Sequence, residues 1–130
     1  MSLTSLTVNQ ILDAFASSDP TPGGGSAAAL SGAVAASLLA MVAAMPKTKT
    51  GADGERKTLG TSGLELQKLR KRLTELIDED TKAYDMVTSA YRQPKGTDEE
   101  KAVRRAAVQE AMRAATEAPL EVMRACRDAV

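Results

Sequence analysis

The chain has 130 residues, which is enough for one domain with a modest core, and its formal net charge is zero. The balance of 17 basic and 17 acidic residues excludes the broad positive surface of a typical nucleic-acid-binding protein. Without histidine and with one cysteine, Cys126, the chain cannot form a Cys/His zinc site, a Ser-His-Asp triad or an intrachain disulfide. Any catalysis must use carboxylates, Lys, Tyr, hydroxyl or backbone groups, and the cysteine content fits a reducing, cytoplasmic setting.

The first expected helix begins at a capping box, Thr7-x-x-Gln10. Its apolar side is expected to comprise Leu6, Ile11, Leu12 and Phe15. The polar residues 17–19 and Pro20 end it.

A second helix is expected between Ser26 and Pro46, about twenty residues or roughly 30 Å long. Gly23, Gly24 and Gly25 precede it, and their high cost inside a helix excludes them from its interior. Ser26 is the expected N-cap and Pro46 the terminator. The glycine loop presents backbone N–H groups for an anion or carbonyl, or is simply a tight turn that allows close packing. It lacks the lysine of a P-loop.

This helix carries no charged residue from Ser26 to Met45, so its faces differ in the size of their side chains and not in polarity. Small residues recur every four positions: Ala28, Gly32, Ala36, Ala40 and Ala44. A bulky face is formed by Leu30, Val34, Leu38, Met41 and Met45. A helix apolar all round is expected to be buried on all sides, as the centre of a bundle or against its twin in a dimer. A membrane span is the alternative, disfavoured because Ala and Ser partition weakly and no second span, basic flank or signal pattern accompanies it.

A glycine-rich connection over residues 46–63 leads to a third helix. Ser62-x-x-Glu65 is a second capping box and a predicted start of this helix. Part of the connection after Asp53 could already be helical. The helix has a seam with strict 3-4 spacing that ends before Pro94. The seam positions are Leu66, Leu69, Leu73, Leu76, Asp80, Ala83, Val87 and Ala90.

The fourth helix begins at a third capping box, Thr97-x-x-Glu100. Its expected apolar positions are Val103, Ala107, Ala111, Ala114 and Ala118. Pro119 kinks or restarts the helix, after which Leu120, Met123, Cys126 and Val130 share a face. The pattern stops at Val130 without a terminating residue, so the chain is expected to be cut short or completed by another subunit. No stretch alternates with period two, and the fold class is therefore all-α, a single helical domain over residues 1–130.

Asp80 is the sharpest candidate for chemistry, because it is a carboxylate at an otherwise apolar seam position. Burial of a carboxylate is costly unless it is paired or hydrogen-bonded, and an acid kept there is suited to acid/base catalysis. The alternatives are an ion pair with a neighbouring helix or a seam that opens to solvent there. Asp85 is a weaker catalytic candidate off the same face.

Tyr84 and Lys95 are candidates for binding. Tyr84 lies one turn beyond Asp80 and can stack on a flat ring or belong to the core. Lys95, in the turn before the fourth helix, can hold an acidic substrate tail or be an ordinary surface lysine.

Three segments together resemble the cyclodeaminase/cyclohydrolase family: PTPGGGSAAALSGAVAASLLAMVA, LIDEDTKAYDMV and RQPKGTDEEKAVRRAAVQEAMRAATEAPLEV. The resemblance runs from about residue 8 to residue 130. It implies an all-helical homodimer acting on one-carbon derivatives of tetrahydrofolate, either as a cyclodeaminase that releases ammonia or as a cyclohydrolase that opens the methenyl ring. It implies that no metal or redox cofactor is required. The zero net charge and the weakly partitioning second helix, in turn, predict no nucleic-acid or membrane partner.

The same resemblance places Gly23, Gly24, Gly25 and Ser26 at the edge of a folate pocket. It makes Asp80 and Asp85 the acidic positions, with Asp80 as acid/base or cation stabiliser, and it makes Lys95 a contact for the glutamate tail. The chain departs from the family by lacking the helices that follow the PLEV stretch, and its connection over 46–63 is unusually rich in Gly and Thr. The alternatives are therefore a truncated, non-catalytic relative that binds folate or dimerises, and a plain helical interaction module.

Overall fold

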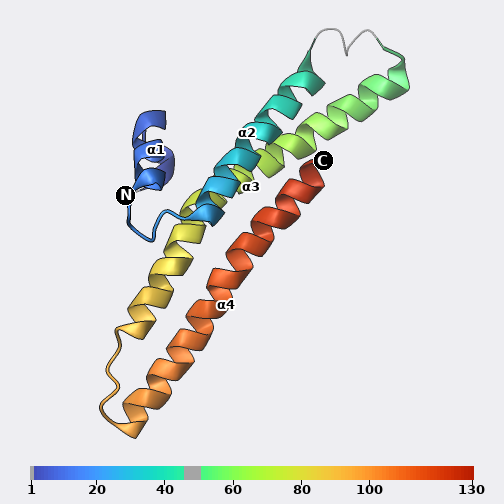
Figure 1. Cartoon of the computed structure of the whole chain (residues 1–130). Coiled ribbons are helices and arrows are strands. Elements are labelled where there is room, and N and C mark those ends of the chain that lie inside the picture. Colours follow the sequence, from blue (N-terminus) through green and yellow to red (C-terminus); the bar gives the residue numbers. More distant parts are fainter. Residues whose placement is uncertain (1, 46–50) are drawn as a thin grey trace.

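The structure, a computed structural model, describes residues 2–45 and 51–130. A 3-10 turn, η1 (Leu3–Ser5), precedes α1 (Val8–Ala16), α2 (Gly24–Ala44), α3 (Asp53–Tyr91) and α4 (Asp98–Ala129). No strand occurs in these two ranges, so the all-α prediction is confirmed. Helix α3 has 39 residues, roughly 60 Å, and Figure 1 shows α2 beside its first half and α4 beside its second, with α1 projecting from the bundle.

Two of the three predicted capping boxes are present. At Thr7 and at Thr97 the hydroxyl oxygen accepts from the N3 backbone N–H, and the N3 side chain of Gln10 or Glu100 accepts from the cap residue's N–H. The box at Ser62 was wrong, because α3 already begins at Asp53 and Ser62 lies inside it. The start of the predicted connection, including Pro46, lies outside the described residues.

The core forms where three helices meet: the first half of α2, the middle of α3 and the last turns of α4. Its buried members are Ala29, Ala33, Ala36, Leu73, Leu76, Ile77, Val122 and Ala125. Most of the buried core residues of α2 and α4 are therefore alanines, and α3 supplies the large side chains. This division keeps the helix axes close together, and it confirms the seam predicted for α3.

The inward face of α2 differs from the predicted small-residue stripe. It consists of Ser26, Ala29, Ala33, Ala36 and Ala40, which follow 3-4-3-4 spacing. The predicted stripe advanced by four residues each time, and this rotates about 40° per step around a 3.6-residue helix, so its ends at Ala28 and Ala44 are exposed. Gly32 does lie at a close approach, because a Cβ there would be 2.7 Å from the Cys126 Sγ.

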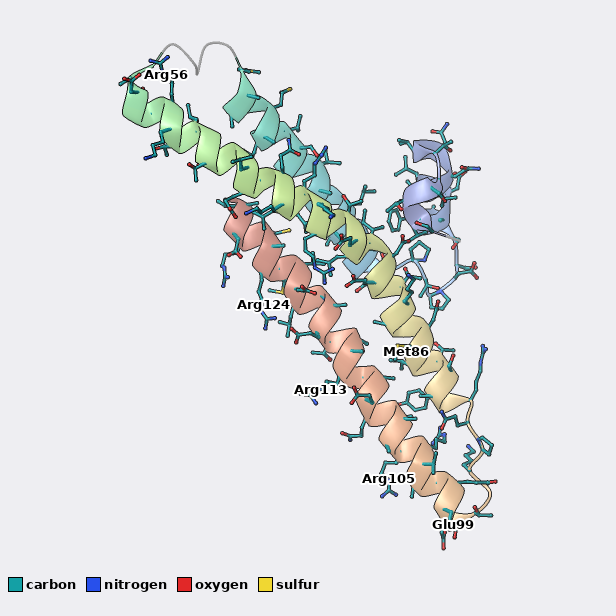
Figure 2. All side chains as sticks on the ribbon, turned by 180° about the vertical axis from the view of Figure 1, so that it is seen from behind. Arg56, Met86, Glu99, Arg105, Arg113 and Arg124 are labelled. Carbon is teal, nitrogen blue, oxygen red and sulfur yellow. The ribbon has the colours of Figure 1, made fainter. Side chains whose placement is uncertain are left out.

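The bulky side of α2 is open in the single chain, so α2 is not the fully buried centre of a bundle within this chain. Val34, Leu38 and Met41 are 53%, 55% and 51% exposed, whereas Leu30 packs partly against the core. Of the described helices, α2 is also the one that is long and apolar enough to cross a membrane, by length and composition only. Its inward face, however, packs on α3 and α4, which carry charged side chains along their outer surfaces (Figure 2).

Helix α4 continues through Pro119 and does not restart. Its buried face, Ala111, Ala118, Val122 and Ala125, therefore keeps one register on both sides of the proline. The face predicted after Pro119 is not the buried one: Leu120, Met123 and Val130 are exposed, and only Cys126 is partly buried against the core.

Charged groups tie the helices together beside the core. Arg72 of α3 donates from Nε to the Glu121 Oε1 of α4 at 3.0 Å and from Nη1 to the Glu79 Oε1 at 2.8 Å. Hydrogen bonds to Glu121 and Glu79 raise the pKa of Arg72, and the Arg72 guanidinium lowers the pKa of Glu121. Asp78, the residue before Glu79, accepts from the backbone N–H of Leu3 at 2.6 Å and fastens η1 to α3.

Candidate functional site

Asp80 meets the N-terminus of α2, and the contact depends on the glycine loop. A Cβ on Gly25 would overlap the Asp80 carboxylate, so only glycine allows the acid to approach this closely. No described glycine has a positive φ, and Gly24 and Gly25 are the first two residues of α2. The glycines are therefore not needed for a left-handed turn; the exclusion of Gly24 and Gly25 from the helix was wrong.

Ser26 is not the N-cap but the third residue of α2, after the N-cap Gly23. Its backbone N–H donates to the Asp80 Oδ2 at 3.1 Å, so a carboxylate from α3 takes the place of the missing side-chain cap. The Ser26 hydroxyl is fully buried and donates to the carbonyl of Ile77 at 2.7 Å. These bonds fix the start of α2 on α3, and the positive end of the helix dipole faces a negative group.

A cavity of about 310 Å³ opens beside this contact. The loop before α2 lines it with Thr21 and Gly23, α2 lines it with its first residue, Gly24, and α3 lines it with Asp80 and Tyr84. Asp80 and Tyr84 are one turn apart and share a face, and Tyr84 is 44% exposed.

The opposite wall of the cavity belongs to α4. Ala115 and Pro119, also one turn apart, line it, and both are half-buried. These two residues and Thr21 were not among the predicted site residues. The only signal in the sequence was Pro119 itself, a proline within a helical pattern, which was interpreted as a kink.

Asp80 is half-buried, not fully enclosed, because one side of its carboxylate is hydrogen-bonded to α2 and the residue lines the cavity. Of the two alternatives considered for this position, the seam does open at this point, whereas the partner of the acid from the neighbouring helix is the backbone N–H of Ser26 and not a charged side chain. A carboxylate held by a helix N-terminus and facing a cavity can attract a cation or accept a proton from a bound molecule.

The other predicted site residues lie elsewhere. Asp85 is exposed and lines a separate cavity of about 460 Å³, with Met86 on the side of α3 that faces α4 (Figure 2). Lys95 is exposed in the α3–α4 turn, and α3 runs roughly 16 Å beyond Asp80 before that turn. The structure therefore brings together the glycine loop, Asp80 and Tyr84, and separates them from Asp85 and Lys95.

Within residues 2–45 and 51–130, no group of three or more His, Cys, Asp or Glu residues is placed to hold a metal ion. The chemistry that this cavity can support with its own residues rests on one carboxylate, one phenol, the hydroxyl of Thr21, helix-terminal N–H groups and backbone carbonyls.

Comparison with known proteins identifies the family of this chain. The family model of formiminotransferase-cyclodeaminase matches residues 7–130. This chain belongs to the formiminotransferase-cyclodeaminase family. It is 44% identical to a methenyltetrahydrofolate cyclohydrolase from Methylorubrum extorquens over 124 residues, which are 95% of this chain and 60% of that protein.

More distant members of the family are the formimidoyltransferase-cyclodeaminases of Rattus norvegicus and Mus musculus. Each is 35% identical over 101 residues, which are 78% of this chain and 19% of the relative. The chain thus spans only part of the curated relatives that it matches. The resemblance expected from the three segments is confirmed.

Proposed function

We propose that this chain acts in one-carbon folate metabolism as a methenyltetrahydrofolate cyclohydrolase, which adds water to 5,10-methenyl-tetrahydrofolate and opens its ring to 10-formyl-tetrahydrofolate. The observation that carries this proposal is the 44% identity to the Methylorubrum extorquens protein of that name over 95% of the chain. The family match includes the glycine loop, Asp80 and Tyr84, which line or support one cavity.

The substrate is a cation delocalised over the two nitrogens that flank the reacting carbon, so a carboxylate beside the cavity attracts it. In the proposed reaction, a water oxygen bonds to that carbon and the Asp80 carboxylate takes the released proton. Asp80 then returns a proton to one of the two nitrogens as the bond between that nitrogen and the carbon breaks. The proton of the newly added hydroxyl leaves to solvent, and its oxygen becomes the formyl oxygen. The products are the formyl compound and one proton.

Other residues have supporting roles in this proposal. Tyr84 stacks on the flat ring of the substrate from the α3 wall, and Gly23 and Gly24 give it a low rim. Lys95, in the turn beyond the end of α3, can reach only the distant glutamate tail. Asp85 has no role in the reaction, because it lines a different cavity. We propose no metal or redox cofactor, since the reaction needs only proton transfer.

Cyclodeamination is the second candidate activity, favoured by the 35% identity to the mammalian formimidoyltransferase-cyclodeaminases. It would close 5-formimino-tetrahydrofolate to the methenyl compound with loss of ammonia. The reacting carbon again lies between two nitrogens, so the same carboxylate can serve both reactions.

Absorbance of the methenyl chromophore separates these possibilities. Wild-type protein is expected to accelerate its loss well beyond spontaneous hydrolysis in buffer. A gain of absorbance and ammonia from the formimino substrate would instead favour the cyclodeaminase. If neither substrate turns over, isothermal titration with 5-formyl-tetrahydrofolate decides between a non-catalytic folate-binding relative, which binds it, and a plain helical module, which does not.

We also propose that the protein is a cytoplasmic homodimer that binds neither nucleic acid nor a membrane. The open face of α2 with Val34, Leu38 and Met41 is the surface that we assign to the second copy, because one chain leaves these side chains more than half exposed. The zero net charge, the single cysteine and the charged faces of α3 and α4 support the remaining parts of this assignment.

Leu38→Lys tests the dimer. It puts a charge on this face without removing a buried contact of the single chain, so the variant is expected to fold and to elute as a monomer in size-exclusion chromatography with light scattering. Lys68→Leu on α3 is a control for charge change and should remain a dimer. Monomeric wild-type protein would contradict the dimer and point to residues beyond this chain as the cover of α2.

A further inference from the structure

Pro119 leaves a backbone carbonyl of α4 without its helical partner. In an α-helix the carbonyl of residue i accepts from the N–H of residue i+4, and proline has no N–H. Pro119 lies inside α4, so the carbonyl of Ala115 cannot form this bond. A proline in a helix interior is strongly unfavourable, yet α4 continues for ten residues beyond it to Ala129.

The turn of α4 that contains this carbonyl lines the cavity that contains Asp80. A helical carbonyl points along the axis toward residue i+4, and Ala115 and Pro119 both line the cavity. Both residues are half-buried, so the surrounding helices do not cover this turn completely. The α4 wall of the cavity is therefore the turn whose carbonyl has lost its helical partner, and it faces the α3 wall, which contains Asp80.

We propose that the Ala115 carbonyl binds the substrate, accepting a hydrogen bond from an N–H group on the edge of its pterin ring. This inference rests on the proposed function, which it deepens by naming the group that orients the ring. A reduced pterin carries amide and amino N–H donors, and an acceptor freed from its helix meets one without breaking an internal bond. With Tyr84 against the ring face, this contact fixes which edge faces α4 and which side reaches Asp80.

Two replacements of Pro119 test the inference. Pro119→Ala and Pro119→Val both restore the N–H and so engage the Ala115 carbonyl within the helix, and valine keeps a side chain of nearly the proline's volume. Both variants are expected to have a raised Tm, because α4 gains a hydrogen bond. Both are also expected to bind 5-formyl-tetrahydrofolate, an unreactive probe with the same ring, about three- to ten-fold more weakly in isothermal titration. KM for the reactive substrate should rise by a similar factor with kcat little changed.

Gly60→Ala is the matched control. A Cβ at Gly60 in α3 meets no other atom within 4 Å, so this variant should raise Tm without weakening binding. Unchanged affinity in both Pro119 variants would overturn the inference, as would weaker binding by the alanine variant alone, which would assign the effect to the proline ring. If wild-type protein binds no 5-formyl-tetrahydrofolate and turns over neither folate substrate, the proposed function fails and this inference with it. Turnover by wild type combined with unaffected Pro119 variants rejects the inference only.

Discussion

The two faces of α2 are made of side chains of different size, and they differ in burial: the inward face packs on α3 and α4, and the outward face is exposed in the single chain. The inward face is small throughout, and Ala29 and Ala36 are completely buried against α3 and α4. The outward face carries Val34, Leu38 and Met41, all more than half exposed. Small side chains inside allow close helix packing and admit the Asp80 carboxylate at the start of α2. The larger apolar surface is not covered within the single chain, and it is the surface that we propose for the second copy.

The strongest way to break the inward face is Gly25→Ala. The new methyl group would overlap the Asp80 carboxylate, so the acid must move and lose its hydrogen bond from Ser26. We expect a loss of about 2–3 kcal/mol in the free energy of unfolding, measured by urea denaturation.

Gly24→Ala is the control for this prediction, because a Cβ at Gly24 meets nothing within 4 Å. It should leave stability unchanged or raise it by up to about 1 kcal/mol. Equal losses in the two variants would show that glycine is needed at both positions for its backbone and not for the approach of Asp80.

A second pair of variants compares the faces directly. Ala36→Leu adds three carbons to a completely buried site and is expected to cost about 1–3 kcal/mol. Val34→Leu adds one carbon on the open face and should change the stability of the monomer by less than about 0.5 kcal/mol. Thermal unfolding of both proteins at a concentration where the chain is monomeric provides the comparison. A larger loss for Val34→Leu would mean that the open face is covered within the chain.

Arg72→Met tests a contact between α3 and α4 that is held by charge and not by apolar packing. It has the smallest expected effect, a loss of less than about 1 kcal/mol in the free energy of unfolding at neutral pH. Because the folded-state pKa of Glu121 lies below its ordinary value of 4.5, the unfolded chain binds more protons near that pH. The stabilisation is therefore present above about pH 4.5 and lost as the pH falls through the lower folded value. The variant should show a shallower loss of stability in this acid range, measured by urea denaturation at several pH values. Identical slopes would show that Glu121 gains nothing from Arg72.

Much of this arrangement is visible in the sequence. The 3-4 seam of α3 predicts its buried positions, because a repeat that averages 3.5 residues stays on one side of a helix. The odd carboxylate in that seam, Asp80, does lie at a cavity with Tyr84 and the glycine loop. Local spacing therefore identified these parts of the candidate site.

Features that depend on a partner distant in sequence were not predictable in this way. Helix α2 begins at Gly24 because Asp80 of another helix caps it, and local propensity alone excluded that start. The register of α4 after Pro119 is fixed by packing of Val122 and Ala125 in the core, which a local reading of apolar positions cannot detect. The α4 wall of the cavity was missed for the same reason.

The most direct test of the central claim is the rate at which Asp80→Asn hydrolyses 5,10-methenyl-tetrahydrofolate, followed by absorbance. The amide oxygen of Asn can still accept from the Ser26 N–H, so the fold and the start of α2 are preserved while the carboxylate is removed. Asp13→Asn on the projecting helix α1 is the matched control and should retain wild-type activity (Figure 1). We predict that kcat of Asp80→Asn falls by about 10²- to 10⁴-fold with an unchanged Tm. A folded Asp80→Asn protein with the kcat of wild type would contradict the assignment of Asp80 as the group that moves the proton.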